Sequence, residues 1–156
     1  INYANFRRLP SEVAAVANEG IAAGMLQSNS AFVSEAVEES ASLVDGFRSD
    51  LGDLESDAQA SGASGSVAIA AGDAYLNFDN GAKAAELYEL ALTRPDVDRA
   101  TALTRLGIAQ VKAGEYAAAQ ESFAKVEGNR APIASLWAAY AKQQASGGTE
   151  TMATAG

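Results

Sequence analysis

The sequence predicts an all-α protein in which helix pairs stack next to one another, and three observations support this fold class. The composition is rich in alanine and contains only 3 prolines in 156 residues, which favours closely packed helices. Apolar residues recur at steps of three and four, the spacing of a helix with one buried face. Small and large residues also recur in the same order after 35 residues, and a fixed period of this length is typical of stacked helical repeats.

The first part of the chain, residues 1–59, is predicted to be an N-terminal extension of two helices. Pro10 is tolerated at a helix start, and the apolar spacing that follows it predicts a helix over 11–27. The stretch Ser-Asn-Ser at 28–30 is a turn and capping signal. A second helix is therefore predicted over 31–58.

The second predicted helix carries an apolar seam that repeats every seven residues. Its members, spaced alternately by four and three, are Val33, Val37, Ser40, Val44, Phe47, Leu51 and Leu54. A seam of this kind pairs with another helix. The partner is either a helix of the same chain or, in a homodimer, a second copy of the chain.

Two copies of a repeat follow a Gly/Ser-rich linker at 60–66. The copies span 67–95 and 102–132, and their equivalent residues are Gly72 and Gly107, Ala84 and Ala119, Tyr88 and Phe123, and Ala91 and Val126. We expect the glycines and the first two alanines to lie where antiparallel helices cross, because only small side chains let two backbones meet. We expect Gly81 and Gly114 in the turns between paired helices. The large residues expected to fill the space toward the neighbouring repeat are Tyr75, Tyr88, Leu106 and Phe123.

This pattern resembles the tetratricopeptide repeat (TPR). The motif matches the second copy at Leu103, Leu106, Gly107, Gly114, Tyr116, Ala119 and Phe123, and the first copy at Gly72, Tyr75, Ala84, Tyr88, Ala91 and Leu92. Gln110 departs where the motif has an aromatic residue, and Asp79 replaces the turn glycine. Pro132 falls one place late and Pro95 one place early. The resemblance covers 67–144 and implies a short α-solenoid of antiparallel helix pairs.

A capping helix is predicted over 132–144, after the second repeat. Its apolar residues are Ile133, Leu136, Trp137 and Tyr140, and Trp137 falls where the motif has its first large residue. We expect Trp137 to pack in the core and the helix to close the stack, because terminal repeats need such closure. The tail at 145–156 lacks apolar anchors and is predicted to be disordered.

The resemblance implies a ligand groove lined by the first helix of each repeat. By position its candidate residues are Ile69, Asp73, Leu76 and Asn77 in the first repeat and Thr101, Thr104, Ile108, Val111 and Lys112 in the second. Family members that bind chaperones hold a terminal carboxylate with basic residues at such positions. Those basic residues are absent here. The groove would instead be apolar and would hold a segment of another protein or the chain's own N-terminal helix.

The composition excludes several classes of function. A net charge of −9 argues against nucleic acid and anionic membranes as partners, and no apolar run is long enough to cross a bilayer. The acids gathered in 31–60 indicate a solvated helix face or a docking face for a basic partner. The chain has no cysteine and no histidine, which removes thiol chemistry, His-based catalysis and the usual zinc sites.

We therefore expect no enzyme, no cofactor and no metal, although the many acids leave a paired-carboxylate hydrolase as an alternative. The sequence predicts a non-catalytic interaction or assembly module for a protein or peptide partner. The alternative is a structural protein that self-associates through the seam at 33–54. The resemblance is to bacterial TPR-like proteins that are often exported, and with Ile1 as the first residue it favours the periplasm over the cytoplasm.

Overall fold

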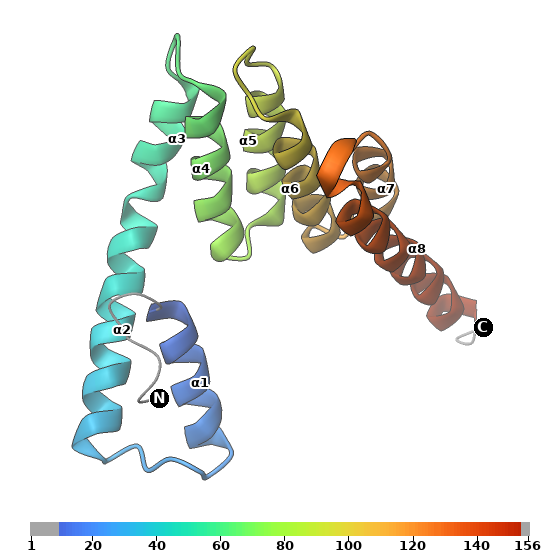
Figure 1. Ribbon diagram of the computed structural model, residues 1–156. Coiled ribbons are helices and arrows are strands. Elements are labelled where there is room, and N and C mark those ends of the chain that lie inside the picture. The colour runs from blue at the N-terminus through green and yellow to red at the C-terminus, as the bar shows by residue number, and fades with distance from the viewer. Residues whose placement is uncertain (1–9, 154–156) are drawn as a thin grey trace. The chain divides into compact units, whose positions relative to one another are not determined.

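The computed structural model of the chain describes residues 10–153, and its side chains to residue 146. These residues form helices and turns and contain no β-strand (Figure 1), so the predicted all-α class is confirmed. The chain divides into two compact units, Ile1–Asp50 and Leu51–Gly156. We expected the boundary in the linker at 60–66, and it lies instead within the predicted second helix.

The first unit contains helices α1 (Pro10–Ala22) and α2 (Ala31–Ser49), which pack against each other. Their buried apolar residues include Val13 and Ala17 on α1 and Val33 on α2. The first helix ends at Ala22, earlier than residue 27, because Gly24 takes a left-handed conformation with φ of 70°. The backbone N–H of Leu26 then bonds back to the carbonyl of Gly20 at 3.0 Å.

The predicted helix over 31–58 is two helices, because α2 ends at Ser49 and α3 (Leu51–Gln59) begins after Asp50. The apolar seam is divided in the same way. Its first members are half-buried or buried in the first unit, Leu51 is buried in the second, and Phe47 between them is 49% exposed. The seam is therefore not one continuous interface.

The second unit continues with α4 (Gly65–Asn77), α5 (Gly81–Leu92), α6 (Arg99–Lys112), α7 (Tyr116–Ala124), the 3₁₀ turn η1 (Gly128–Arg130) and α8 (Ala131–Ala153). Each of the helices α3 to α8 packs against the next one along the chain (Figure 1). Helix α3 belongs to this unit because Ala58 is fully buried in a cluster with Ala68, Ala71, Leu87 and Ala91 of α4 and α5.

The small residues of the two repeats are buried, but the glycines face aromatic rings and not a helix backbone. A Cβ atom added to Gly72 would lie 2.6 Å from the ring of Tyr88, and one added to Gly107 would lie 2.4 Å from the ring of Phe123. The expectation of direct backbone contact at these glycines is therefore wrong. The missing side chain makes room for the large residue 16 positions further along the same repeat.

The same two rings also reach the next helix pair, as expected for large residues. Tyr88 shares a buried cluster with Leu106 and Ala109 of α6. Phe123 stacks on Trp137 of α8, with ring centroids 6.4 Å apart. Each aromatic residue therefore closes its own repeat and also holds the helix that follows.

The turns inside the two repeats are equivalent, although their residues differ. Asp79 and Gly114, which are 35 residues apart, both have positive φ, 57° and 80°. The backbone N–H groups of the residues that follow them, Asn80 and Glu115, donate to the carbonyls of Tyr75 and Gln110. Asp79 therefore occupies the turn position that a glycine fills in the second repeat.

Gly81 is not in the turn, contrary to expectation, but is the first residue of α5. A Cβ atom there would lie 2.6 Å from the carbonyl oxygen of Ala109 and 2.9 Å from the backbone nitrogen of Ala113. Because backbone atoms cannot move aside as a side chain can, this is the place in the second unit where two helices approach most closely through a glycine.

Helix α8 continues to Ala153, past residue 144 where we expected a disordered tail to begin. No proline interrupts this stretch, and the hydroxyl of Ser146 donates to the carbonyl of Lys142 one turn earlier at 3.0 Å. The last expected tail residues, 154–156, lie outside the described residues. Lys142 on α8 lies 35 residues after Gly107. Its side chain is exposed, so α8 does not repeat the contact between an aromatic ring and a glycine.

Candidate functional site

All of the predicted groove residues lie on α4 and α6, and several of them are engaged in holding the fold. Asp73 accepts a hydrogen bond from the hydroxyl of Tyr88 at 2.6 Å and forms an ion pair with Arg105. Lys112 forms an ion pair with Asp79 in the turn after α4. The first ion pair joins α4 to α6, and the second joins α6 to the turn that follows α4.

The predicted threonines support α6 itself. Asp98 is the N-cap residue of this helix. Its carboxylate accepts hydrogen bonds from the backbone N–H of Thr101 at 3.2 Å and from the Thr101 hydroxyl at 2.6 Å. These hydrogen bonds lower the pKa of Asp98. Thr104 is buried, and its hydroxyl donates to the carbonyl of Ala100 at 2.7 Å. Neither hydroxyl is therefore placed to select a ligand.

The apolar candidates are partly used by the core. Ile69 and Leu76 pack against the cluster that contains Tyr88. Ile108 and Val111 pack against the cluster that contains Phe123. All four are half-buried, and Asn77 is exposed at the end of α4. Most of the predicted groove side chains therefore already have structural partners.

Sequence reasoning missed the exposed apolar row on α8. Ile133, Leu136 and Tyr140 follow one another at steps of three and four and are 45%, 68% and 45% exposed. We expected these residues to share an apolar face with Trp137, for which core packing was predicted. Only Trp137 is half-buried, because it stacks on Phe123, and no described helix follows α8 to cover the other three.

One member of the exposed row, Tyr140, is held in place by neighbouring aromatic rings. The ring of Tyr140 meets the ring of Trp137 edge-on, with centroids 5.8 Å apart and an angle of 89°. Such aromatic pairs are favourable beyond the area that they bury. Since Trp137 is itself stacked on Phe123, Tyr140 is fixed at the surface by a chain of ring contacts that leads into the core.

Two arginines on elements that contact α8 were also missed. Arg105 lies on α6, and Arg130 ends the turn η1, which contacts both α6 and α8. Burial lowers the pKa of Arg105, and the nearby charge of Arg130 lowers it further. Arg130 forms no ion pair with a described residue. The spacing could have found Arg105, which lies one helical turn after Thr101 on the predicted ligand face.

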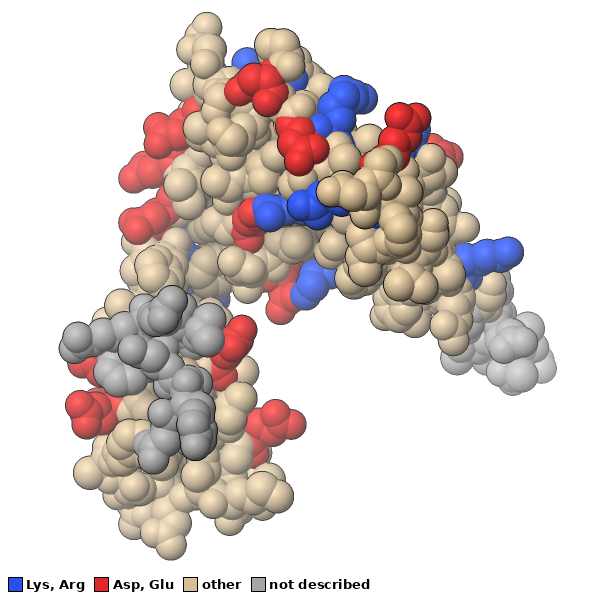
Figure 2. Space-filling model, viewed as in Figure 1, with Lys and Arg blue, Asp and Glu red and all other residues tan. Residues whose placement is uncertain are grey.

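The charges of the second unit are unevenly distributed along the chain. Residues 51–90 carry seven acids and one base, a net charge of −6, whereas residues 91–146 carry seven bases and five acids, a net charge of +2. On the face shown in Figure 2, acidic side chains line the edge formed by α3, whereas basic and acidic side chains are interspersed over α5 and α6. The end of the array that carries the apolar row is thus its least acidic part.

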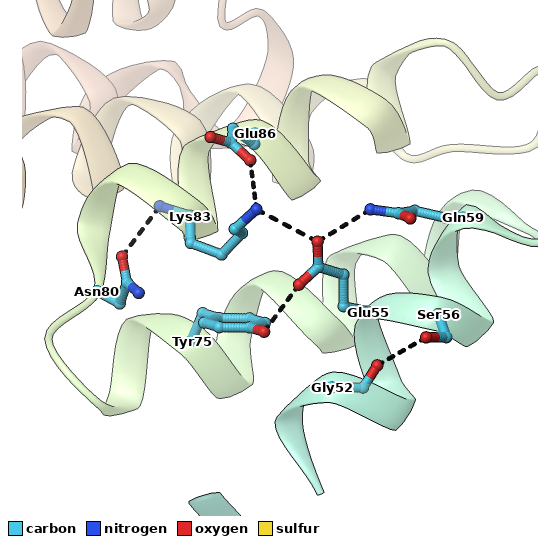
Figure 3. Close-up of polar contacts among 8 residues, drawn as sticks. All are labelled: Gly52, Glu55, Ser56, Gln59, Tyr75, Asn80, Lys83 and Glu86. Carbon is cyan, nitrogen blue, oxygen red and sulfur yellow. Dashed lines mark hydrogen bonds and ion pairs between the residues drawn. The ribbon is translucent and has the colours of Figure 1, made fainter.

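A separate polar network joins α3, α4 and α5 around Glu55 (Figure 3). The carboxylate of Glu55 accepts from the hydroxyl of Tyr75 at 2.9 Å, from the ammonium of Lys83 at 3.2 Å and from the amide of Gln59 at 2.9 Å. Lys83 also donates to Glu86 at 2.7 Å.

This network favours fixed charges and not proton exchange. The hydrogen bond from Tyr75 is the largest cause that lowers the pKa of Glu55, and the hydrogen bond to Glu86 is the largest cause that raises the pKa of Lys83. A general acid or base needs a pKa that is moved toward neutral pH, whereas both groups here move away from it. The arrangement is therefore suited to holding three helices together.

Comparison of the chain with family models, with curated proteins and with solved structures gives no match. Among the described residues, no helix is long and apolar enough to cross a membrane. In the same part of the chain, no group of three or more acidic residues is placed to hold a metal ion.

Proposed function

We propose that the chain is a non-catalytic protein-binding or assembly module built from two TPR-like repeats and a capping helix. The proposal is supported by details that recur 35 residues apart. An aromatic ring covers a glycine in each repeat, and each internal turn contains one left-handed residue. The polar network around Glu55, in which the charges are paired, supports a structural and not a catalytic use of the acids.

The observation that carries the proposal is the exposed apolar row on α8. Leu136 is 68% exposed, and Ile133 and Tyr140 are each 45% exposed on the same side of one helix. Isolated exposed apolar residues are ordinary, but contiguous ones rimmed by polar groups mark interaction surfaces. The row adjoins α6, whose outward side chains belong to the predicted ligand face. We therefore propose that a partner binds at α6 and α8, beyond the residues that the sequence suggested.

Site-specific photo-crosslinking in the source cell tests this proposal. A photoreactive side chain at Leu136 or Tyr140 is expected to form adducts with another protein. The same side chain at Glu89, which is exposed on α5, is expected to form none. The proposal is wrong if positions 136 and 140 give no adduct, or if adducts at Glu89 are equally frequent.

Self-association through the seam at 33–54 is the second candidate function. It is supported by the 49% exposure of Phe47, whereas Val33 and Ser40 are already buried within the first unit. Sedimentation of the chain over a wide concentration range tests it. This candidate requires a dimer that Phe47→Glu dissociates and Leu136→Asp leaves intact, and a monomer at all concentrations would exclude it.

A further inference from the structure

Two cations and an apolar row lie on three elements that contact one another, and we name them together the α6–α8 face: Arg105, Arg130, Ile133, Leu136 and Tyr140. Arg105 lies on α6, Arg130 on η1 and the other three on α8. We propose that the partner bound at this face is an amphipathic helix with acidic side chains. This inference rests on the proposed binding function and names the chemistry of the partner.

The two arginines still have guanidinium donors available for an external carboxylate. Arg105 is paired with Asp73, whose other carboxylate oxygen already accepts from Tyr88. Arg130 is half-buried and forms no ion pair with a described residue, although its charge helps to lower the pKa of Asp98 nearby. A guanidinium carries five donors, and its strongest partners are carboxylates that bind two of them at once. A carboxylate from outside the chain can therefore bind Arg130 without breaking an ion pair of the fold.

The net charge of the region around this face differs in sign from that of the whole chain. The chain has a net charge of −9, yet residues 91–146 carry +2. An acidic partner is repelled by most of the molecule and is favoured only near this end of the array. Complementary charge of this kind orients a partner and sets specificity more than it adds affinity. It therefore selects where an acidic segment lies on the array.

The apolar row is regularly spaced along one helix. Ile133, Leu136 and Tyr140 occupy two turns of one helix, and Trp137 fixes the ring of Tyr140. A partner helix covers such a row with apolar residues at steps of three and four. Tyrosine and arginine are also the residue types that most often dominate the energy of an interface. The two features together describe a partner that is apolar on one side and acidic along its edge.

Binding of two designed peptides to the full chain tests the inference. Both are labelled amphipathic helices of about 20 residues with leucine on one face. One carries glutamate and the other lysine on the remaining positions. Fluorescence anisotropy is expected to show that the glutamate peptide binds at least about tenfold tighter than the lysine peptide. The affinity should fall as salt is added, because exposed charge pairs are screened.

Variants locate the binding on the α6–α8 face. Arg130→Glu and Leu136→Asp should each weaken binding of the glutamate peptide by about tenfold or more, a loss in the range that alanine scans assign to dominant interface residues. Arg130→Gln, a milder change, should weaken it less. The matched controls are Arg48→Glu and Met25→Asp, which make the same chemical changes at exposed positions of the first unit and should leave binding unchanged. Circular dichroism confirms that each variant is folded.

Three results would overturn the inference. The first is equal binding of the two peptides, or no binding of either. The second is binding of the glutamate peptide that Arg130→Glu and Leu136→Asp do not weaken. The third is a dimer of the chain alone that Leu136→Asp dissociates, because a second copy would then occupy the face. If photo-crosslinking captures a partner but the glutamate peptide fails to bind, the binding function stands and only the acidic chemistry is wrong.

Discussion

The first repeat, α4 with α5, and the second repeat, α6 with α7, use one packing scheme with different polar groups. In both, an aromatic ring covers a glycine, yet Tyr88 adds a hydroxyl that donates to Asp73, whereas Phe123 has none and stacks on Trp137. The difference follows from the neighbours. Tyr88 lies beside the α4–α6 surface with its ion pair, whereas Phe123 lies beneath the last helix of the array.

The second difference lies where the motif expects an aromatic residue on the first helix. Tyr75 fills this place in the first repeat, and its hydroxyl donates to Glu55 on α3. Gln110 fills it in the second and accepts from the buried hydroxyl of Ser122 at 2.7 Å. The comparison teaches that apolar volume is repeated between the two copies, whereas each hydrogen bond is adapted to the helix that lies beside it.

Removing the ring that closes the second repeat should have the largest effect. Phe123→Ala is expected to lower the free energy of unfolding by about 3–5 kcal/mol, because it leaves a cavity over Gly107 and removes the stacking partner of Trp137. Chemical denaturation followed by the fluorescence of Trp137, the one tryptophan of the chain, measures it. A loss below that of an exposed control such as Leu136→Ala would show that the ring does not close the repeat.

Filling the space under the ring should have the next largest effect. Gly107→Ala places a Cβ atom 2.4 Å from the ring of Phe123, and overpacking of this kind costs about 1–3 kcal/mol. Gly52→Ala is the control, because a Cβ atom there meets nothing within 4 Å and alanine favours the helix by up to about 1 kcal/mol. Urea titrations should give shifts of opposite sign, and two shifts of the same sign would contradict the packing described here.

Breaking the buried hydrogen bond between Gln110 and Ser122 should lower stability by a smaller amount, and a second substitution should restore most of it. Ser122→Ala leaves the Gln110 side chain without its donor and is expected to cost about 1–3 kcal/mol. The double variant Gln110→Leu/Ser122→Ala removes both polar groups and should recover most of that loss. Equal stability of the single and double variants, measured by thermal and urea unfolding, would mean that the hydrogen bond carries no energy.

The hydroxyl of Tyr88 sharpens the comparison through pH. Burial raises the pKa of Tyr88 from 10.0 to about 12. Between these values the unfolded chain loses this proton and the folded chain keeps it, so stability falls as pH rises. Tyr88→Phe should cost about 1 kcal/mol at neutral pH and should flatten the alkaline loss. Unfolding measured from pH 8 to pH 12 checks this, with Tyr140→Phe as the exposed control, and an unchanged slope in Tyr88→Phe would contradict it.

The sequence by itself determined the all-α class, the period of 35 residues and the presence of a turn between the two helices of each repeat. These depend on local spacing and on residue size, which a single sequence displays directly. It also placed Gly72, Gly107, Ala84 and Ala119 in the interior, although it named the wrong contact for the glycines. The ring of an aromatic residue and a helix backbone demand the same small neighbour, so size alone cannot distinguish them.

Only the tertiary structure decided which apolar and charged side chains remain available. Ile133, Leu136 and Tyr140 have the spacing of a core face, and they are exposed because no described helix covers α8. Asp73 and Lys112 have the position of ligand groups, and they are paired with Arg105 and Asp79. Spacing identifies the residues that share a face of one helix, but burial and pairing depend on what packs against that face. Those neighbours come from segments far apart in the sequence.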